Sequence, residues 1–133
     1  MRANTILLGA CACLLAWPAA AHHSFSMFDN QKTITLTGTV KQLEWTNPHC
    51  WLDIVVQDES GKTIEYPLEM QGTGQSVKNG WKPDTLKPGD KVSADIHPLR
   101  AVGAHGGQLI AVVMPDGRKL AVTGQPASPF GEN

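Results

Sequence analysis

Histidines are the residues of this chain best suited to hold a metal ion. Two of them, His22 and His23, are adjacent, and the other three are far apart at His49, His97 and His105. None of the five forms a pair at helical or zinc-finger spacing, so the sequence carries no local metal-binding motif. A metal site would therefore have to be assembled by the chain terminus or by the fold.

The two adjacent histidines follow a segment typical of a secretory signal. Arg2 precedes an apolar stretch over residues 5–17, and small residues then lead up to Ala21. We expect cleavage between Ala21 and His22, with a cut one residue earlier as the alternative. A lipoprotein-type cut at Cys11 is disfavoured because the apolar stretch continues well beyond that residue. The protein is therefore expected to be periplasmic or secreted.

Either cut creates a terminus that can bind Cu(II). A chain starting at His22 offers its amine and imidazole to one ion, and a chain starting at Ala21 has His23 in the third position, where amine, backbone amides and imidazole form a square plane. Such nitrogen ligands select Cu(II) among first-row divalent ions. Copper is thus the expected cofactor if there is one, with candidate ligands His22, His23, His49, His97 and His105. The alternative is a recognition segment that packs Phe25 and Phe28 against the domain.

Alternating hydrophobicity predicts that β-strands position these residues. Between Lys32 and Val40 every second residue, Gly38 among them, belongs to one largely apolar face. The apolar set then changes phase at Leu43, which predicts a bulge or bend near Lys41. Further strands are expected over residues 49–58, 62–70, 91–98, 108–115 and 118–122.

One short helix is expected between the third and fourth strands, with Thr73 as N-cap and Gly80 as its left-handed stop. This order predicts a mainly β protein, a small OB-fold-like five-stranded antiparallel barrel over residues 32–122. An incomplete sandwich with the same number of strands is the alternative. Residues 1–21 are expected to be the signal peptide, 22–31 an N-terminal arm and 123–133 a flexible tail.

In an OB-fold, the loops that follow the first and fourth strands border the usual ligand face. His49 ends the first of these loops in this interpretation, and His97 begins the second, which also contains His105. We therefore expect these three histidines at one rim. The candidate ligand-binding residues are Asn47, His49, Trp51, His97 and Arg100.

His49 and its neighbour Cys50 are not expected to form a catalytic pair. Adjacent residues of a strand point to opposite faces, so Cys50 is expected to be buried. It is the only cysteine left after cleavage, which excludes an internal disulfide.

A series of short motifs resembles a family of small exported bacterial proteins of unknown function. In chain order these motifs are HHSF, GTVKQLEWTNPH, LEM, GW, TLKPGD, HPLR, GG and PDGR. The resemblance covers nearly the whole mature chain and implies no activity. The order of elements is also similar to that of bacterial periplasmic OB-fold proteins.

Charge excludes one class of partner. The whole chain has 11 basic and 12 acidic residues, and removal of Arg2 leaves 10 and 12, a formal charge of −2. This balance argues against nucleic acid as a partner. No transmembrane segment is expected after processing, because the remaining sequence has no apolar stretch of the required length.

Three functions remain open. The favoured one is a binding module for a small ligand, a metal ion or a periplasmic protein. The second is an accessory protein or enzyme of the cell envelope with histidine and carboxylate chemistry, for which the outward-facing Glu65 and Glu69 are candidates. The third is a structural domain that binds a partner through an apolar patch.

Overall fold

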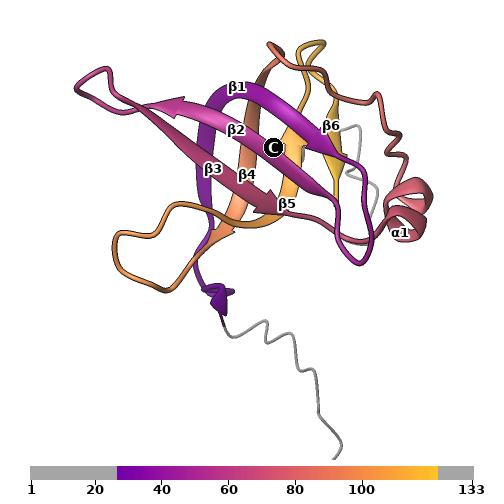
Figure 1. Cartoon of the computed structure of the whole chain (residues 1–133), viewed down its shortest axis with the longest axis horizontal. Helices are drawn as coiled ribbons and strands as arrows, with labels where there is room; N and C mark the ends of the chain where they lie inside the picture. The colour runs from indigo at the N-terminus through magenta and orange to yellow at the C-terminus, as the bar shows by residue number, and fades with distance from the viewer. Residues whose placement is uncertain (1–26, 123–133) are drawn as a thin grey trace, which may run out of the picture.

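The computed structural model describes residues 27–122, which form a single sheet closed into a barrel (Figure 1). Its elements are β1 (Ile34–Glu44), β2 (Trp51–Gln57), β3 (Thr63–Glu69), α1 (Thr73–Lys78), β4 (Lys91–Pro98), β5 (Gly107–Val113) and β6 (Lys119–Ala121). The strand order is β3-β2-β1-β4-β5-β6, with an additional pairing between β3 and β5. The predicted mainly β, OB-fold-like barrel with one helix between the third and fourth strands is confirmed. Within these residues we find no helix with the length and apolar character needed to cross a membrane.

The pair that closes the barrel is parallel. β3 pairs with β5 over Leu68 and Glu69 only, whereas the other pairs in the ring are antiparallel. A ring with an odd number of strands cannot alternate direction throughout, so one parallel pair is required. β6 continues the sheet beyond β5 and is the predicted short final strand.

β1 is shared between two halves of the barrel. Its first half, from Ile34 to Thr39, pairs with β4, and its second half, from Thr39 to Glu44, pairs with β2. The register with β2 shifts between Val40 and Gln42, so the predicted bulge near Lys41 is confirmed. The bulge restores the inward direction of the apolar side chains after the strand has bent.

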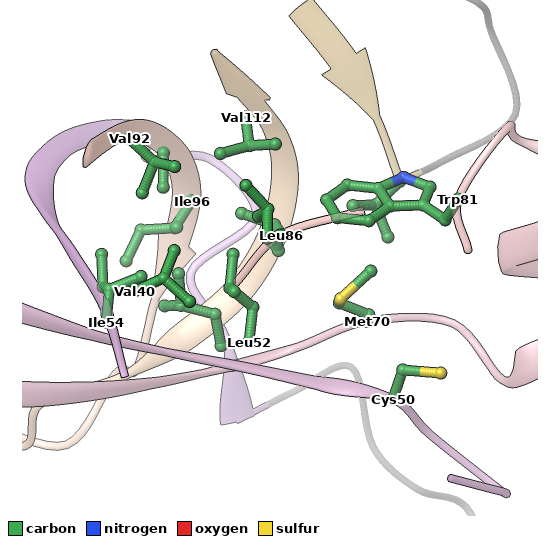
Figure 2. Packing of buried hydrophobic residues seen from close by; sticks show 14 of the residues in the cluster. Val40, Cys50, Leu52, Ile54, Met70, Trp81, Leu86, Val92, Ile96 and Val112 are labelled. Carbon is green, nitrogen blue, oxygen red and sulfur yellow. The ribbon is translucent and has the colours of Figure 1, made fainter. Parts of the chain in front are cut away.

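The core is sealed at one end by Trp81, which is completely buried. Its ring lies beside Leu86 and Met70 (Figure 2). The indole Nε1 donates a hydrogen bond to the carbonyl oxygen of Ala121 at 2.9 Å, which ties this end to β6. Cys50 is also completely buried, in agreement with the strand phase.

The helix begins one residue earlier than expected. Gly72 is the N-cap of α1 and Thr73 is its first helical residue, so the prediction of Thr73 as N-cap is wrong. The reason is a long-range contact, because the side-chain oxygen of Asn47 accepts a hydrogen bond from the Thr73 backbone N–H at 3.0 Å. Gly80 has a φ of 88°, as expected for a left-handed stop.

Candidate functional site

Four residues from four strands are direct lateral neighbours on the outer face of the barrel. Trp51 on β2 pairs with Glu69 on β3, Glu69 with Gln108 on β5, and Gln108 with His97 on β4. Paired residues share a face of the sheet, and strands are spaced about 4.8 Å apart, so these four side chains form a line about 15 Å long. We call Trp51, Glu69, Gln108 and His97 the outer row.

The outer row faces away from the core, since the residues that alternate with it point inward. These alternate residues are Leu52, Leu68, Leu109 and Ile96, and all four are completely buried. All four members of the outer row are themselves half-buried. Because these side chains are partly packed against their neighbours, their polar and aromatic groups have defined positions on the outer face.

His49 joins the outer row through Glu69. Its Nδ1 lies 3.1 Å from Oε1 of Glu69, and the two side chains are 29% and 17% exposed. The loop of residues 45–50 is fixed at this point, because Thr46 donates a hydrogen bond from Oγ1 to the His49 carbonyl oxygen at 2.8 Å. A partly shielded histidine–carboxylate pair offers both hydrogen-bond donors and acceptors at this end of the outer row.

Asn47 has a structural role. Its side-chain oxygen accepts hydrogen bonds from both the backbone N–H and the hydroxyl of Thr73, at 3.0 and 3.1 Å. These contacts join the loop of residues 45–50 to the start of α1. We therefore assign Asn47 to the support of His49.

Arg100 also has a structural role, since it fixes the N-terminal arm to the loop of residues 99–106. Its Nε donates to the carbonyl oxygen of Phe28 at 2.9 Å, and its backbone N–H donates to that of Met27 at 2.9 Å. Phe28 forms a bridge with Leu99 and is 4% exposed. We call this attachment of Met27 and Phe28 to Leu99 and Arg100 the arm clasp.

The three histidines that the structure describes have separate partners. Nδ1 of His97 lies 2.9 Å from the carbonyl oxygen of Lys32, whereas Nδ1 of His105 lies 3.3 Å from the hydroxyl of Tyr66. His97 also belongs to β4 and does not begin the following loop, which starts at Leu99. No group of three or more His, Cys, Asp or Glu residues able to hold a metal ion occurs over residues 27–122. His22 and His23 lie outside the described residues.

Acidic side chains surround Trp51 on the outer face of β1, β2 and β3. Trp51 has Glu44 as its partner on β1 and Glu69 as its partner on β3, and two more carboxylates, Asp53 and Glu65, follow on the same face. Nζ of Lys41 binds Glu65 at 2.8 Å, and this hydrogen bond raises the pKa of Lys41 above its usual value. Four carboxylates and one lysine on this face favour ligands that carry positive charge.

Gln108 and the position of Glu69 beside His49 were not predicted. Glu69 was recognised only as an outward acid, and Gln108 only as the start of a strand. Only the pairing of β3 with β5 places Gln108 beside Glu69. This pairing forms when the barrel closes, so the pattern of a single strand does not reveal it.

Fold and site together define a small OB-fold-like β-barrel with a polar and aromatic row on its outer face. The chain belongs to a family of unknown function, DUF6152, whose model matches residues 10–108. No curated protein and no solved structure matches the chain significantly.

Proposed function

We propose that this protein is an exported binding module whose ligand lies along the outer row. The observation that carries the proposal is the lateral pairing of Trp51, Glu69, Gln108 and His97 on four strands. In OB-folds the face of the second and third strands, bordered by the loops after the first and fourth strands, is the usual ligand face. Export rests on the signal-like segment before His22.

The chemistry of the outer row favours a ligand with a flat, positively charged group. Trp51 supplies an aromatic surface, and the carboxylates of Glu44 and Glu69 flank it on the neighbouring strands. A cation above an indole ring is stabilised by the ring quadrupole, and a guanidinium group can also donate two parallel hydrogen bonds to one carboxylate. The Gln108 side chain offers a further donor and acceptor along the row.

We expect agmatine, a small guanidinium compound, to bind saturably to the chain and to shift the indole resonance of Trp51. Glu69→Gln should weaken this binding at least about tenfold, since a charge-assisted hydrogen bond is worth about 1.5–3 kcal/mol. The titration is followed by nuclear magnetic resonance on uniformly ¹⁵N-labelled protein.

Glu65→Gln is the matched control for this experiment. It removes the same charge from the same face of β3, four residues away, where Glu65 binds Lys41 rather than His49. The control should change agmatine affinity by less than about twofold, because an exposed charge contributes little at a distance. Equal weakening by both variants would reject the outer row as the site.

The arm clasp favours a second candidate function, copper binding by the N-terminus. Arg100 holds Met27 on one leg of the loop of residues 99–106, and His105 lies on the other leg. The five residues 22–26 can extend at most ~17 Å from Met27. This reach includes His105, so the histidine terminus and one loop histidine could share a metal ion.

For this candidate we expect a processed protein that begins at His22 or Ala21, determined by intact mass. It should bind Cu(II) with a nitrogen-rich electron paramagnetic resonance spectrum. His22→Ala should change this spectrum and weaken Cu(II) binding at least about tenfold, because planar nitrogen ligands dominate the affinity for this ion.

His49→Ala is the matched control for the copper titration. It removes an imidazole that contacts Glu69 and leaves the arm clasp unchanged. Cu(II) binding that weakens equally in His49→Ala and His22→Ala would reject the terminus as the site.

A further inference from the structure

The two ends of the barrel differ in how well their apolar side chains are covered. Trp81 and Leu86 seal one end and are almost completely buried. At the other end the hairpin of β2 and β3 extends away from the barrel (Figure 1). Its inward-facing apolar residues, Val56, Ile64 and Tyr66, are only half-buried. We call these three residues the hairpin face.

The hairpin face is half-buried because, in this part of the hairpin, β2 no longer pairs with β1 and β3 no longer pairs with β5. β2 pairs with β1 only as far as Val55, and β3 pairs with β5 only at Leu68 and Glu69. Val56 and Ile64 pair with each other beyond these limits. Val56 and Tyr66 pack against the core on one side, and the rest of the hairpin face stays partly exposed within the described residues.

The loop of residues 99–106 borders the hairpin face. The His105 ring packs edge-on against Tyr66, with 5.2 Å between ring centroids and an interplanar angle of 62°. His105 lies opposite Arg100 in this loop, because the Leu99 N–H donates to the Gly106 carbonyl oxygen at 3.2 Å. The loop thus connects the hairpin face to the arm clasp.

We propose that the segment just before Met27 covers the hairpin face, with the Phe25 side chain packed against Tyr66. The Arg100 N–H donates a hydrogen bond to the Met27 carbonyl oxygen, and Arg100 lies opposite His105. Met27, Arg100 and His105 therefore lie on three adjacent backbone segments, each about 4.8 Å from the next. Two residues from Met27 to Phe25 add up to ~7 Å of chain, and the phenylalanine side chain extends further. A segment of this length can bring the Phe25 ring to Tyr66.

The composition of this segment fits the proposal. Over residues 22–26, HHSFS, Phe25 is the only large apolar side chain. Phe28, three residues later, is buried beside Leu99, so the arm carries one aromatic residue on each side of Met27. Aromatic pairs such as Phe with Tyr are favoured beyond the area they bury. The inference does not depend on either proposed function.

The test uses the chain from His22 to Asn133 and follows Tyr66, which is the only tyrosine of the protein. We expect a nuclear Overhauser effect between the rings of Phe25 and Tyr66. Phe25→Ala should shift the Tyr66 ring resonances and speed amide hydrogen exchange at residues 64–66 about tenfold, since local opening then exposes less apolar surface.

Phe130→Ala is the matched control, because it removes the other phenylalanine beyond the described residues from the opposite end of the chain. Tyr66 and its neighbours should be unchanged in this variant. The inference is overturned if Phe25→Ala leaves hydrogen exchange at residues 64–66 unchanged, or if the Phe25 contact appears only as protein concentration rises. The second outcome would assign the hairpin face to another copy of the chain.

Discussion

Replacing Trp81 with alanine is expected to lower the free energy of unfolding by about 3–5 kcal/mol. The side chain is completely buried between Met70, Leu86 and β6, and it donates a hydrogen bond to Ala121. Removal of the ring leaves a cavity at the sealed end and an unpaired carbonyl oxygen. This is a large part of the stability that a domain of this size has. Urea unfolding followed by circular dichroism measures the change.

Trp51→Ala is the control for this prediction. It removes the same side chain from the outer row, where the ring is half-buried on the solvent side of β2. The expected loss is about 1 kcal/mol, because little core packing is lost at such a position. Equal losses for the two variants would contradict the assignment of Trp81 to the core and of Trp51 to the outer row.

Local pattern was sufficient to predict the strands. The phase of the alternation predicted the bulge at Lys41 and the burial of Cys50, and the structure agrees on both. These features depend on which face of a strand a residue points to, and that is fixed by a repeat of two residues. Cross-strand pairing is not needed for either of them.

The candidate site was predicted only in part. Trp51 and His97 belong to the outer row, and His49 reaches it, but Gln108 became visible only once β3 and β5 were paired. Neighbours in the outer row are far apart in the sequence and depend on closure of the barrel. Sequence periodicity gives the face of each residue and leaves the lateral register undefined.

The remaining predicted site residues have roles that follow from long-range polar contacts. Asn47 receives hydrogen bonds from Thr73, and Arg100 binds the arm through Phe28. A polar loop residue is equally suited to binding a ligand or a distant backbone group, so its type does not decide between them. The three described histidines were expected at one rim, and the structure gives each a different partner residue: Glu69, Lys32 or Tyr66.

Gly38→Val is expected to lower the free energy of unfolding by about 3 kcal/mol, the upper part of the range for overpacking. An added Cβ at Gly38 would lie 2.6 Å from the carbonyl oxygen of Val55, which is backbone and cannot rotate away. Gly38 belongs to the segment where β1 passes from β4 to β2, so a wider residue forces these strands apart. Chemical denaturation measures the loss of stability.

Gly74→Ala is the matched control for Gly38→Val. No atom lies within 4 Å of an added Cβ at Gly74, and alanine is favoured over glycine by about 0.5–1 kcal/mol inside a helix, so this variant should be slightly more stable than the parent.

Gly38→Val should also speed amide hydrogen exchange at Gln108. The bend in β1 lets the sheet curve until β3 meets β5, and Gln108 belongs to that short closing pair. A loss of stability without faster exchange at Gln108 would mean that the outer row persists without this bend. Faster exchange there would tie the alignment of the outer row to a single glycine on β1, the one strand of the ring that contributes no residue to the row.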